Sequence, residues 1–403
     1  MNKMVGSFLT PVRYFDEISP KGLKRFGDAY DVRRDVLYAQ AIIVRNSRIK
    51  VDNFPKLLAV ARAGAGVDKI DVERATELGI AVFNTEGENA QSVKEILFAA
   101  LESNACNLRE AERFVNDIVV DEAHGDFKSQ YEAGKSAFVR HELRGQTLGI
   151  IGINGHIGRL VAKGGVGRGM RVVGYDKVPA IKKQKKIRRV RSVEQVLNKA
   201  DVLTVHVPET PETRHMIGRE QIVQMKDGCI LINYAREDII DTAAVLEALD
   251  SGKLGAYLTD FPTEELCRHG KVRCTPHLGA STYEAEERCA TVAVLLLKAY
   301  LELCNVTRSV NIPANELPPP DTGETGVTRL GVIHQNVPNM LGRIDAIIGH
   351  AEINIRTNQN KTKGRIGYYL VDLEGAVPHE VIEEIERLKG ILRVRAIRFP
   401  RQE

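Results

Sequence analysis

The chain has 403 residues, of which 43% are hydrophobic, and its formal net charge is +4 at pH 7. A chain of that length is too long to fold around one compact core, so we expect two or three domains. The small net charge gives no general reason to expect nucleic acid or a membrane as a partner. Six scattered cysteines form no CxxC pair, and no apolar run approaches the roughly 20 residues that span a bilayer. These features favour a cytoplasmic protein with reduced thiols and no metal site.

Residues 1 to about 95 form an α/β segment with candidate strands "AIIVR", "LLAVARAG" and "AVFN". The second strand runs into "ARAGAGVD". There the backbone N–H groups of Gly64, Ala65 and Gly66 could form a concave nest for a carboxylate, because no bulky side chain blocks close approach. A tight turn at the end of a strand would explain the same residues equally well.

Residues 140 to 280 alternate short β-rich runs with amphipathic helical patterns. The runs are "TLGIIGI", "MRVVGYD", "DVLTVHVP", "CILINYA" and "AYLTDF". This rhythm predicts βαβ units around a parallel sheet, in which ligands bind at the carboxyl ends of the strands. We therefore expect the residues that close the later runs to contact a cofactor, namely His206, Val207, Pro208, Ala235 and Asp260.

The first run leads into a glycine-rich turn from Gly152 to Gly158, with Asn154, Gly155, His156 and Ile157 inside it. The turn is one residue longer than the GxGxxG of dinucleotide-binding loops. Asn154 or Gly155 can replace the second glycine, since Asn tolerates a left-handed backbone. The next run ends in Asp176, where an acid binds the adenosine ribose and repels a 2′-phosphate. Together these features predict an NAD site, although the adjacent Lys177 leaves the preference over NADP open.

Three polar residues follow later strands of the same sheet: Arg236, Glu264 and His277. Each alone is more often a surface charge or a structural residue. Together they offer an arginine to grip a carboxylate and polarise a carbonyl, a histidine to accept a hydroxyl proton, and a carboxylate to orient that histidine. In this order they suit the oxidation of a 2-hydroxy acid.

The segment "IKKQKKIRRVRS", Ile181 to Ser192, holds seven Lys and Arg residues and no acid. A nucleic-acid patch is one interpretation. No aromatic residues are interleaved for base stacking, so we favour a solvated face.

After "PANELPPPDTGETG", residues 313–326, which we predict to be a linker or hinge, the pattern reads strand, helix, strand, strand, helix, strand. This order fits a ferredoxin-like βαββαβ module over residues 327–403.

The segments "NYARED", "LTDFPTEEL", "CTPHLGASTYEAEE" and "RAGAGVDKIDVERATELGIAVFNT" resemble the NAD-dependent D-2-hydroxyacid dehydrogenases. The resemblance implies two doubly wound Rossmann-like domains, a discontinuous substrate domain (1–98 and 282–312) and an NAD domain (99–281). It implies that Arg236 binds and polarises the substrate, that His277 is the acid/base and that Glu264 supports it. The sequence departs from the family in its longer glycine turn and in Glu237, where the family commonly has Gly.

The resemblance also implies phosphate-binding roles for Arg45 and Arg62. The expected activity is the NAD-dependent oxidation of D-3-phosphoglycerate to 3-phosphohydroxypyruvate, the first step of L-serine biosynthesis. Two alternatives remain: a related dehydrogenase acting on an unphosphorylated acid such as glyoxylate or hydroxypyruvate, and a non-catalytic protein that senses NAD or binds nucleic acid.

The last module resembles an ACT domain, a unit that commonly binds amino acids at a subunit interface. His334, Asn336 and Asn354 match positions with which serine-regulated members hold serine, and amide side chains suit both a carboxylate and an ammonium. The alternative is a dimerisation module without a ligand. By resemblance we expect a homo-oligomer, specifically a tetramer, with serine as its effector.

Overall fold

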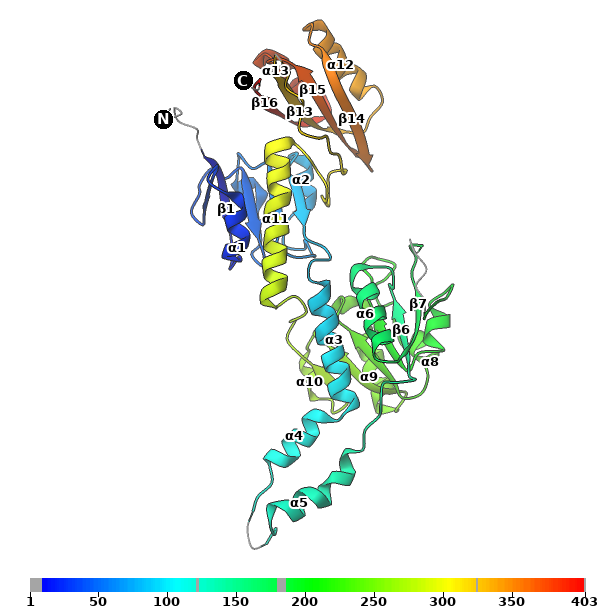
Figure 1. Ribbon diagram of the computed structural model, residues 1–403. Coiled ribbons are helices and arrows are strands. Elements are labelled where there is room, and N and C mark those ends of the chain that lie inside the picture. The colour runs from blue at the N-terminus through cyan, green and yellow to red at the C-terminus, as the bar shows by residue number, and fades with distance from the viewer. Residues whose placement is uncertain (1–8, 121–122, 180–185, 324, 402–403) are drawn as a thin grey trace. The chain divides into compact units, whose positions relative to one another are not determined.

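The computed structural model describes residues 9–120, 123–179, 186–323 and 325–401 (Figure 1). The chain divides into two compact units. One comprises Met1–Glu88 and Tyr283–Glu403, and the other comprises Asn89–Thr282. Both are built on parallel sheets, as the alternating pattern predicted, and the first also contains the antiparallel C-terminal sheet.

The first unit begins with a parallel sheet in the order β2-β1-β3-β4-β5. Successive apolar side chains in its strands point to opposite faces, so that Ile42 and Val60 enter one core and Ile43 and Ala61 the other. Helix α11 covers the second of these faces. The elements are β1 (Thr10–Tyr14), α1 (Pro20–Leu23), β2 (Tyr30–Arg33), β3 (Ala41–Val44), β4 (Ala59–Arg62), α2 (Val72–Glu77), β5 (Ala81–Asn84) and α11 (Tyr283–Leu303).

The C-terminal module has the predicted βαββαβ order and an antiparallel sheet ordered β14-β15-β13-β16. Its two helices cover one face of this sheet. The other face presents Ile333, Tyr368 and Leu370 to a core shared with Phe83 and Tyr300 of the first sheet and α11. The elements are β13 (Val327–Gln335), α12 (Met340–His350), β14 (Ile355–Lys363), β15 (Ile366–Glu374), α13 (His379–Arg387) and β16 (Ile391–Phe399).

This shared core bears on the predicted domain bounds. Within segment 313–326, Asn315 is buried and donates from Nδ2 to the carbonyl of Tyr368 at 3.0 Å. The backbone N–H of Leu317 donates to Oδ1 of Asn305 at 3.0 Å. The segment therefore anchors the module to the rest of its unit.

The predicted break at residue 98 falls inside helix α3 (Ala90–Ala105), whereas the units divide at residues 88 and 282. The functional domain bounds stay a prediction.

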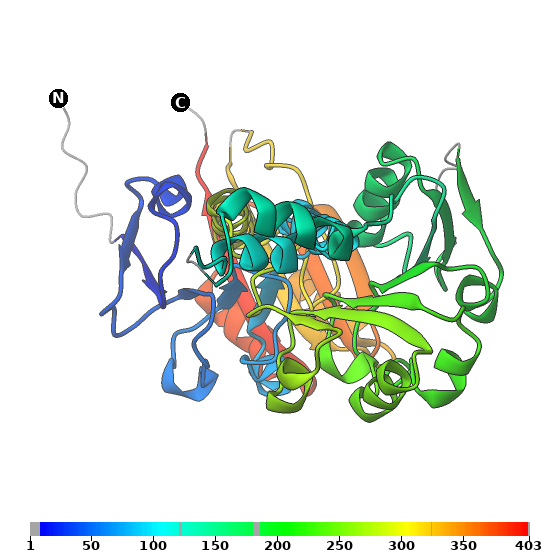
Figure 2. The ribbon, with the colours of Figure 1, turned by 90° about the horizontal axis from the view of Figure 1, so that it is seen from below.

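The second unit has a seven-stranded parallel sheet in the order β12-β11-β10-β9-β6-β7-β8, and Figure 2 shows helices on both sides of these green strands. The chain reverses direction across the sheet between β6 and β9, which is where doubly wound folds bind their ligand. The strands are β6 (Thr147–Ile151), β7 (Arg171–Tyr175), β8 (Ile187–Arg189), β9 (Val202–Val205), β10 (Cys229–Asn233), β11 (Leu254–Thr259) and β12 (Val272–Cys274). Besides α3, the helices are α4 (Leu108–Asn116), α5 (Phe127–Gly134), α6 (His156–Gly167), α7 (Glu194–Leu197), α8 (Arg219–Val223), α9 (Thr242–Asp250) and α10 (Glu264–Arg268).

Several elements were not expected from the sequence, notably strands β1 and β2 and helices α4 and α5. Of the basic segment, residues 181–185 lie outside the described residues, while strand β8 adds to the edge of the sheet beside β7. Among the described residues, no helix is long and apolar enough to cross a membrane.

Candidate active site

The predicted cofactor and catalytic residues of the second unit follow the carboxyl ends of its parallel strands. Gly152 follows β6, Asp176 follows β7, His206 follows β9, Asp260 follows β11 and His277 follows β12. Because these strands run in the same direction, the sheet brings all five residues to one edge.

The glycine turn meets the steric demands of a dinucleotide loop. Gly152 has φ 86°, and a Cβ there would lie 2.3 Å from the carbonyl oxygen of His206. A Cβ on Gly158 would lie 2.1 Å from the carbonyl oxygen of Gly152. At Gly155, which precedes α6, the nearest atom to such a Cβ is 3.4 Å away. Gly152 and Gly158 are therefore required because neighbouring backbone atoms leave no room for a side chain. At Gly155 the space is open, and there a pyrophosphate can approach the helix N-terminus.

Asp176 and Asn154 form a small network beside this turn. The carboxylate of Asp176 accepts from the backbone N–H of Asn154 at 2.7 Å and from that of Val178 at 2.8 Å. Asn154 donates from Nδ2 to the carbonyl of Val178 at 2.5 Å, and its Oδ1 accepts from the guanidinium of Arg189. The extra residue of the long turn thus binds the strand-end acid, and His156 and Ile157 open the helix that follows.

His277 lies beside a carboxylate, but this carboxylate is not the expected one. Nδ1 of His277 is 3.1 Å from Oδ2 of Asp260, whose side chain is fully buried. Glu264 begins α10 with its side chain 78% exposed and is paired with Arg268 one helical turn later. In the structure the Asp260 carboxylate therefore lies nearer to His277 than the side chain of Glu264 does, and the supporting role of Glu264 stays a prediction.

Arg236 follows β10 at a loop shaped by Asn233. The buried Asn233 accepts from the backbone N–H of Ala235 at 3.1 Å and donates to the carbonyl of Arg236 at 2.9 Å. The Arg236 side chain is half-buried and donates to the carbonyl of Ala235 at 2.7 Å. Glu237, the departure from the family pattern, opens a short 3₁₀ turn (Glu237–Ile239) and is exposed.

His206 and Val207, which follow β9, are half-buried, and Pro208 is exposed. Burial lowers the pKa of His206 to about 3, and its Nε2 lies 3.1 Å from Oγ1 of Thr204. Its buried Nδ1 has no hydrogen-bond partner among the described residues. The imidazole is therefore neutral at ordinary pH, which suits a wall of a site but not a proton-transfer group.

In the first unit, Arg45 and Arg62 follow the neighbouring strands β3 and β4. Nε of Arg62 donates to the carbonyl of Arg45 at 3.0 Å, and its Nη1 donates to the carbonyl of Gly66 at 2.6 Å. Arg62 thus braces the turn formed by Gly64, Ala65 and Gly66. The Arg45 guanidinium lies 2.7 Å from a carboxylate oxygen of Glu286 on α11, so an anion reaching Arg45 competes with Glu286.

Asp16 holds the loop that carries Arg45. Its carboxylate accepts from the backbone N–H groups of Arg45, Asn46 and Ser47 and from the Ser47 hydroxyl. Burial on its own raises the pKa of Asp16, but these hydrogen bonds outweigh it and lower the pKa to about 2.

The three predicted serine-binding residues do not meet within one chain. His334 is buried on β13, with Nδ1 2.8 Å from the Gln335 carbonyl and Nε2 3.1 Å from Oδ1 of Asn360. Asn336 donates to the carbonyl of Gly364 at the same end of the sheet. Asn354 lies before β14 beside Glu374, which pairs with the opposite end of β13. A serine site that uses all three therefore needs a second copy of the chain.

The doubly wound fold of the second unit, and the residues gathered at the carboxyl ends of its parallel strands, define a dinucleotide-dependent oxidoreductase. Residues 118–279 match the family model described as D-isomer specific 2-hydroxyacid dehydrogenase, NAD binding domain. A D-3-phosphoglycerate dehydrogenase from Haemophilus influenzae is 33% identical over 86% of this chain and 83% of its own. The chain belongs to the D-2-hydroxyacid dehydrogenases and is an NAD-dependent oxidoreductase.

Two further relatives support this assignment. A D-3-phosphoglycerate dehydrogenase from Methanocaldococcus jannaschii is 37% identical over 69% of this chain and 53% of its own. The solved structure of D-lactate dehydrogenase from Aquifex aeolicus, complexed with NAD and lactic acid, has a TM-score of 0.58 at 26% identity, covering 75% of this chain and all of the other.

Two further residues, Asn233 and Glu286, shape the site and were not expected from the sequence. Asn233 was visible as a polar residue at the end of the apolar run "CILINYA", which is a signal for a buried hydrogen-bonding role. Glu286 gave no signal, because its position opposite Arg45 depends on how α11 packs on the sheet.

Proposed function

We propose that this protein acts in the cytoplasm and oxidises D-3-phosphoglycerate to 3-phosphohydroxypyruvate, the first step of L-serine biosynthesis. The observation that carries the proposal is the cluster of NAD loop, Arg236, Asp260 and His277 at one sheet edge. It is supported by curated D-3-phosphoglycerate dehydrogenases at 31–37% identity.

In this reaction His277 would accept the proton of the substrate's 2-hydroxyl group through Nε2, and the Asp260 carboxylate, 3.1 Å from Nδ1, would stabilise the imidazolium that forms. Arg236 pairs with the substrate carboxylate and stabilises the negative charge that develops on the 2-oxygen. NAD, when bound, accepts the hydride from C2. The products are the 2-oxo acid, NADH and the proton on His277.

Arg45 and Arg62 are proposed to bind the substrate phosphate, and the turn at Gly64, Ala65 and Gly66 its carboxylate. Two arginines suit a phosphate because each can donate two parallel hydrogen bonds. The Arg45–Glu286 pair would open as the phosphate binds. A competing carboxylate also supports the second candidate, an unphosphorylated 2-hydroxy acid.

The test is NADH formation with D-3-phosphoglycerate, beside lactate, glycerate and other unphosphorylated 2-hydroxy acids, in wild type and in Arg45→Gln. We expect turnover of the phosphorylated substrate, with a KM raised about 10-fold or more in the variant. Lys21, which is exposed and paired with Glu287 on the same helix as Glu286, provides the control variant Lys21→Gln. Turnover only with unphosphorylated acids would reject the phosphate roles, and no turnover would favour an NAD-sensing protein.

We also propose that the chain forms a homo-oligomer, a tetramer by resemblance, in which serine binds between two copies. Edge strand β14 is exposed along most of its length and is available to a second copy. His334 and Asn336 from one copy would then combine with Asn354 of another.

Serine regulation is tested by the initial rate at millimolar serine. Inhibition that Asn354→Ala removes, with the uninhibited rate unchanged, would support the shared site. A rate that stays constant with serine would leave the module as a dimerisation unit.

A further inference from the structure

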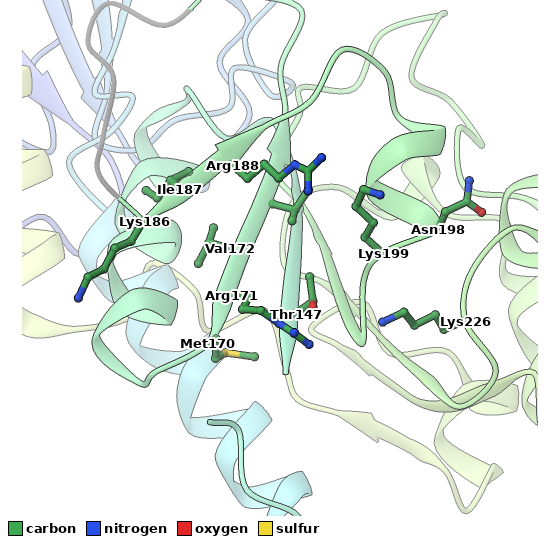
Figure 3. Close-up of a pocket in the computed structure, with 11 residues that line it drawn as sticks. Thr147, Met170, Arg171, Val172, Lys186, Ile187, Arg188, Asn198, Lys199 and Lys226 are labelled. Carbon is green, nitrogen blue, oxygen red and sulfur yellow. The ribbon is translucent and has the colours of Figure 1, made fainter. Parts of the chain in front are cut away.

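A pocket of about 800 Å³ lies in the second unit, away from the cofactor loop (Figure 3). It is lined by residues at or before the starts of strands, including Thr147 of β6, Arg171 of β7 and Lys199 ahead of β9. Gly152, in contrast, follows the other end of β6. At 3.3 Å per residue the two ends of that strand are roughly 13 Å apart, so the pocket and the NAD loop occupy opposite edges of the sheet.

The charge in this pocket has one sign. The described residues that line it include Arg171, Lys186, Arg188, Lys199 and Lys226, and none of them is acidic. In Figure 3, Arg171, Arg188, Lys199 and Lys226 surround a common space, while Lys186 points away from it.

Among the described residues, an acidic neighbour pairs with one of these cations, Lys226. Lys226 lies 2.7 Å from Oδ1 of Asp201, whose other oxygen accepts from the backbone N–H of Thr147. Within the described ranges, no acidic side chain pairs with Arg171, Arg188 or Lys199. Like charges held around one space repel one another, and a bound polyanion would relieve this repulsion.

The floor of the pocket is apolar. Met170, Val172 and Val173 are buried, and Ile187 is half-buried beside them. Small-molecule sites combine such a floor with a few converging polar groups and typically measure about 300–1,000 Å³. A thioether and branched aliphatic side chains suit the face of a flat heterocycle.

We propose that this pocket binds a nucleoside polyphosphate, with the base on the apolar floor and the phosphates among Arg171, Arg188 and Lys199. The residues that line the pocket offer no aromatic ring on which successive bases would stack, which favours a small ligand over a nucleic-acid strand. Arg188 belongs to the basic segment Ile181 to Ser192, whose pattern favoured a solvated face, and here its side chain would contact the phosphates.

The test is calorimetric titration of the full-length protein with ATP in the presence of saturating NADH, which blocks adenine binding at the cofactor loop. We expect ATP to bind, tripolyphosphate to compete with it, and the affinity to fall as salt concentration rises. Displacement of ATP by NADH would overturn the proposal, because ATP would then occupy the cofactor site. Binding of a single-stranded oligonucleotide that ATP does not displace would also overturn it.

The double variant Arg171→Glu/Arg188→Glu reverses two of the charges and should weaken ATP binding about 10-fold or more. The milder Lys199→Gln should weaken it less while disturbing the fold less. Lys128→Glu on α5 is the matched control for a charge reversal elsewhere in the unit. Unchanged NADH affinity shows that each variant is folded, and equal ATP affinity in all of them would overturn the proposal.

Discussion

At the scale of single residues, the site depends on which carboxylate orients His277. The order of residues along the chain favoured Glu264, whereas the structure places Asp260 at Nδ1 and leaves Glu264 exposed beside Arg268. Both acids follow β11, only four positions apart. Their side chains differ in burial because Asp260 closes the strand while Glu264 starts a surface helix.

We expect Asp260→Asn to lower kcat about 100-fold, since an amide cannot stabilise the imidazolium that forms when His277 takes the proton. Glu264→Gln should have a much smaller effect. Steady-state rates of both variants, with NADH affinity measured separately, decide between the two carboxylates. A larger loss in Glu264→Gln would restore the role predicted from sequence.

His206 should make the fold sensitive to acid. Its pKa is about 3 in the folded chain, against the ordinary 6.5, so between these values the unfolded chain binds a proton that the folded chain does not. The free energy of unfolding therefore falls with decreasing pH, by up to about 1.4 kcal/mol per pH unit from this residue. Urea unfolding of wild type and His206→Gln at pH 6 and pH 5 measures the difference. Equal pH dependence in the two proteins would contradict the assignment.

At the scale of elements, the glycine turn combines two requirements in seven residues. Gly152 and Gly158 are needed for the strand and helix to approach each other, while Gly155 is needed only for a ligand. The sequence showed the glycines, and it also showed that the turn was too long. It did not show that Asn154 binds Asp176 and Arg189, which is how the extra residue is accommodated.

Two substitutions separate these requirements. Gly158→Ala should destabilise the second unit, because its Cβ would meet the Gly152 carbonyl at 2.1 Å. Gly155→Ala should leave the melting temperature nearly unchanged but weaken NADH binding, since its Cβ extends into the phosphate space. Thermal melting and NADH titration of both variants provide the measurements. Normal NADH affinity in a stable Gly155→Ala would argue against pyrophosphate at this position.

At the scale of the whole molecule, a buried ion pair joins the C-terminal module to its unit. Arg329 on β13 donates to both carboxylate oxygens of Asp372 on β15, at 2.7 and 2.8 Å. The same guanidinium donates to the carbonyls of Leu303, after which α11 ends, and of Pro318. The pair thus connects two strands, a helix end and the predicted linker.

Asp372→Asn should destabilise the first unit by about 3–5 kcal/mol, because it leaves the buried guanidinium without its counter-charge. Denaturant unfolding followed by circular dichroism measures this loss. NADH binding belongs to the second unit and should persist under conditions where the first unit has begun to unfold. A loss of under about 1 kcal/mol would mean that the carbonyl contacts alone satisfy Arg329.

The sequence by itself determined the α/β class, the βαββαβ module, the glycine turn and the strand-end positions of Arg236 and His277. These features depend on local periodicity and on steric limits among adjacent residues, which a linear sequence records directly. Only the tertiary structure decided that Asp260 meets His277, that Glu286 opposes Arg45, that His334 and Asn354 lie at opposite ends of their sheet, and that the module shares a core with the first sheet. Those contacts are set by strand order, register and helix packing, which bring together residues that no local pattern relates.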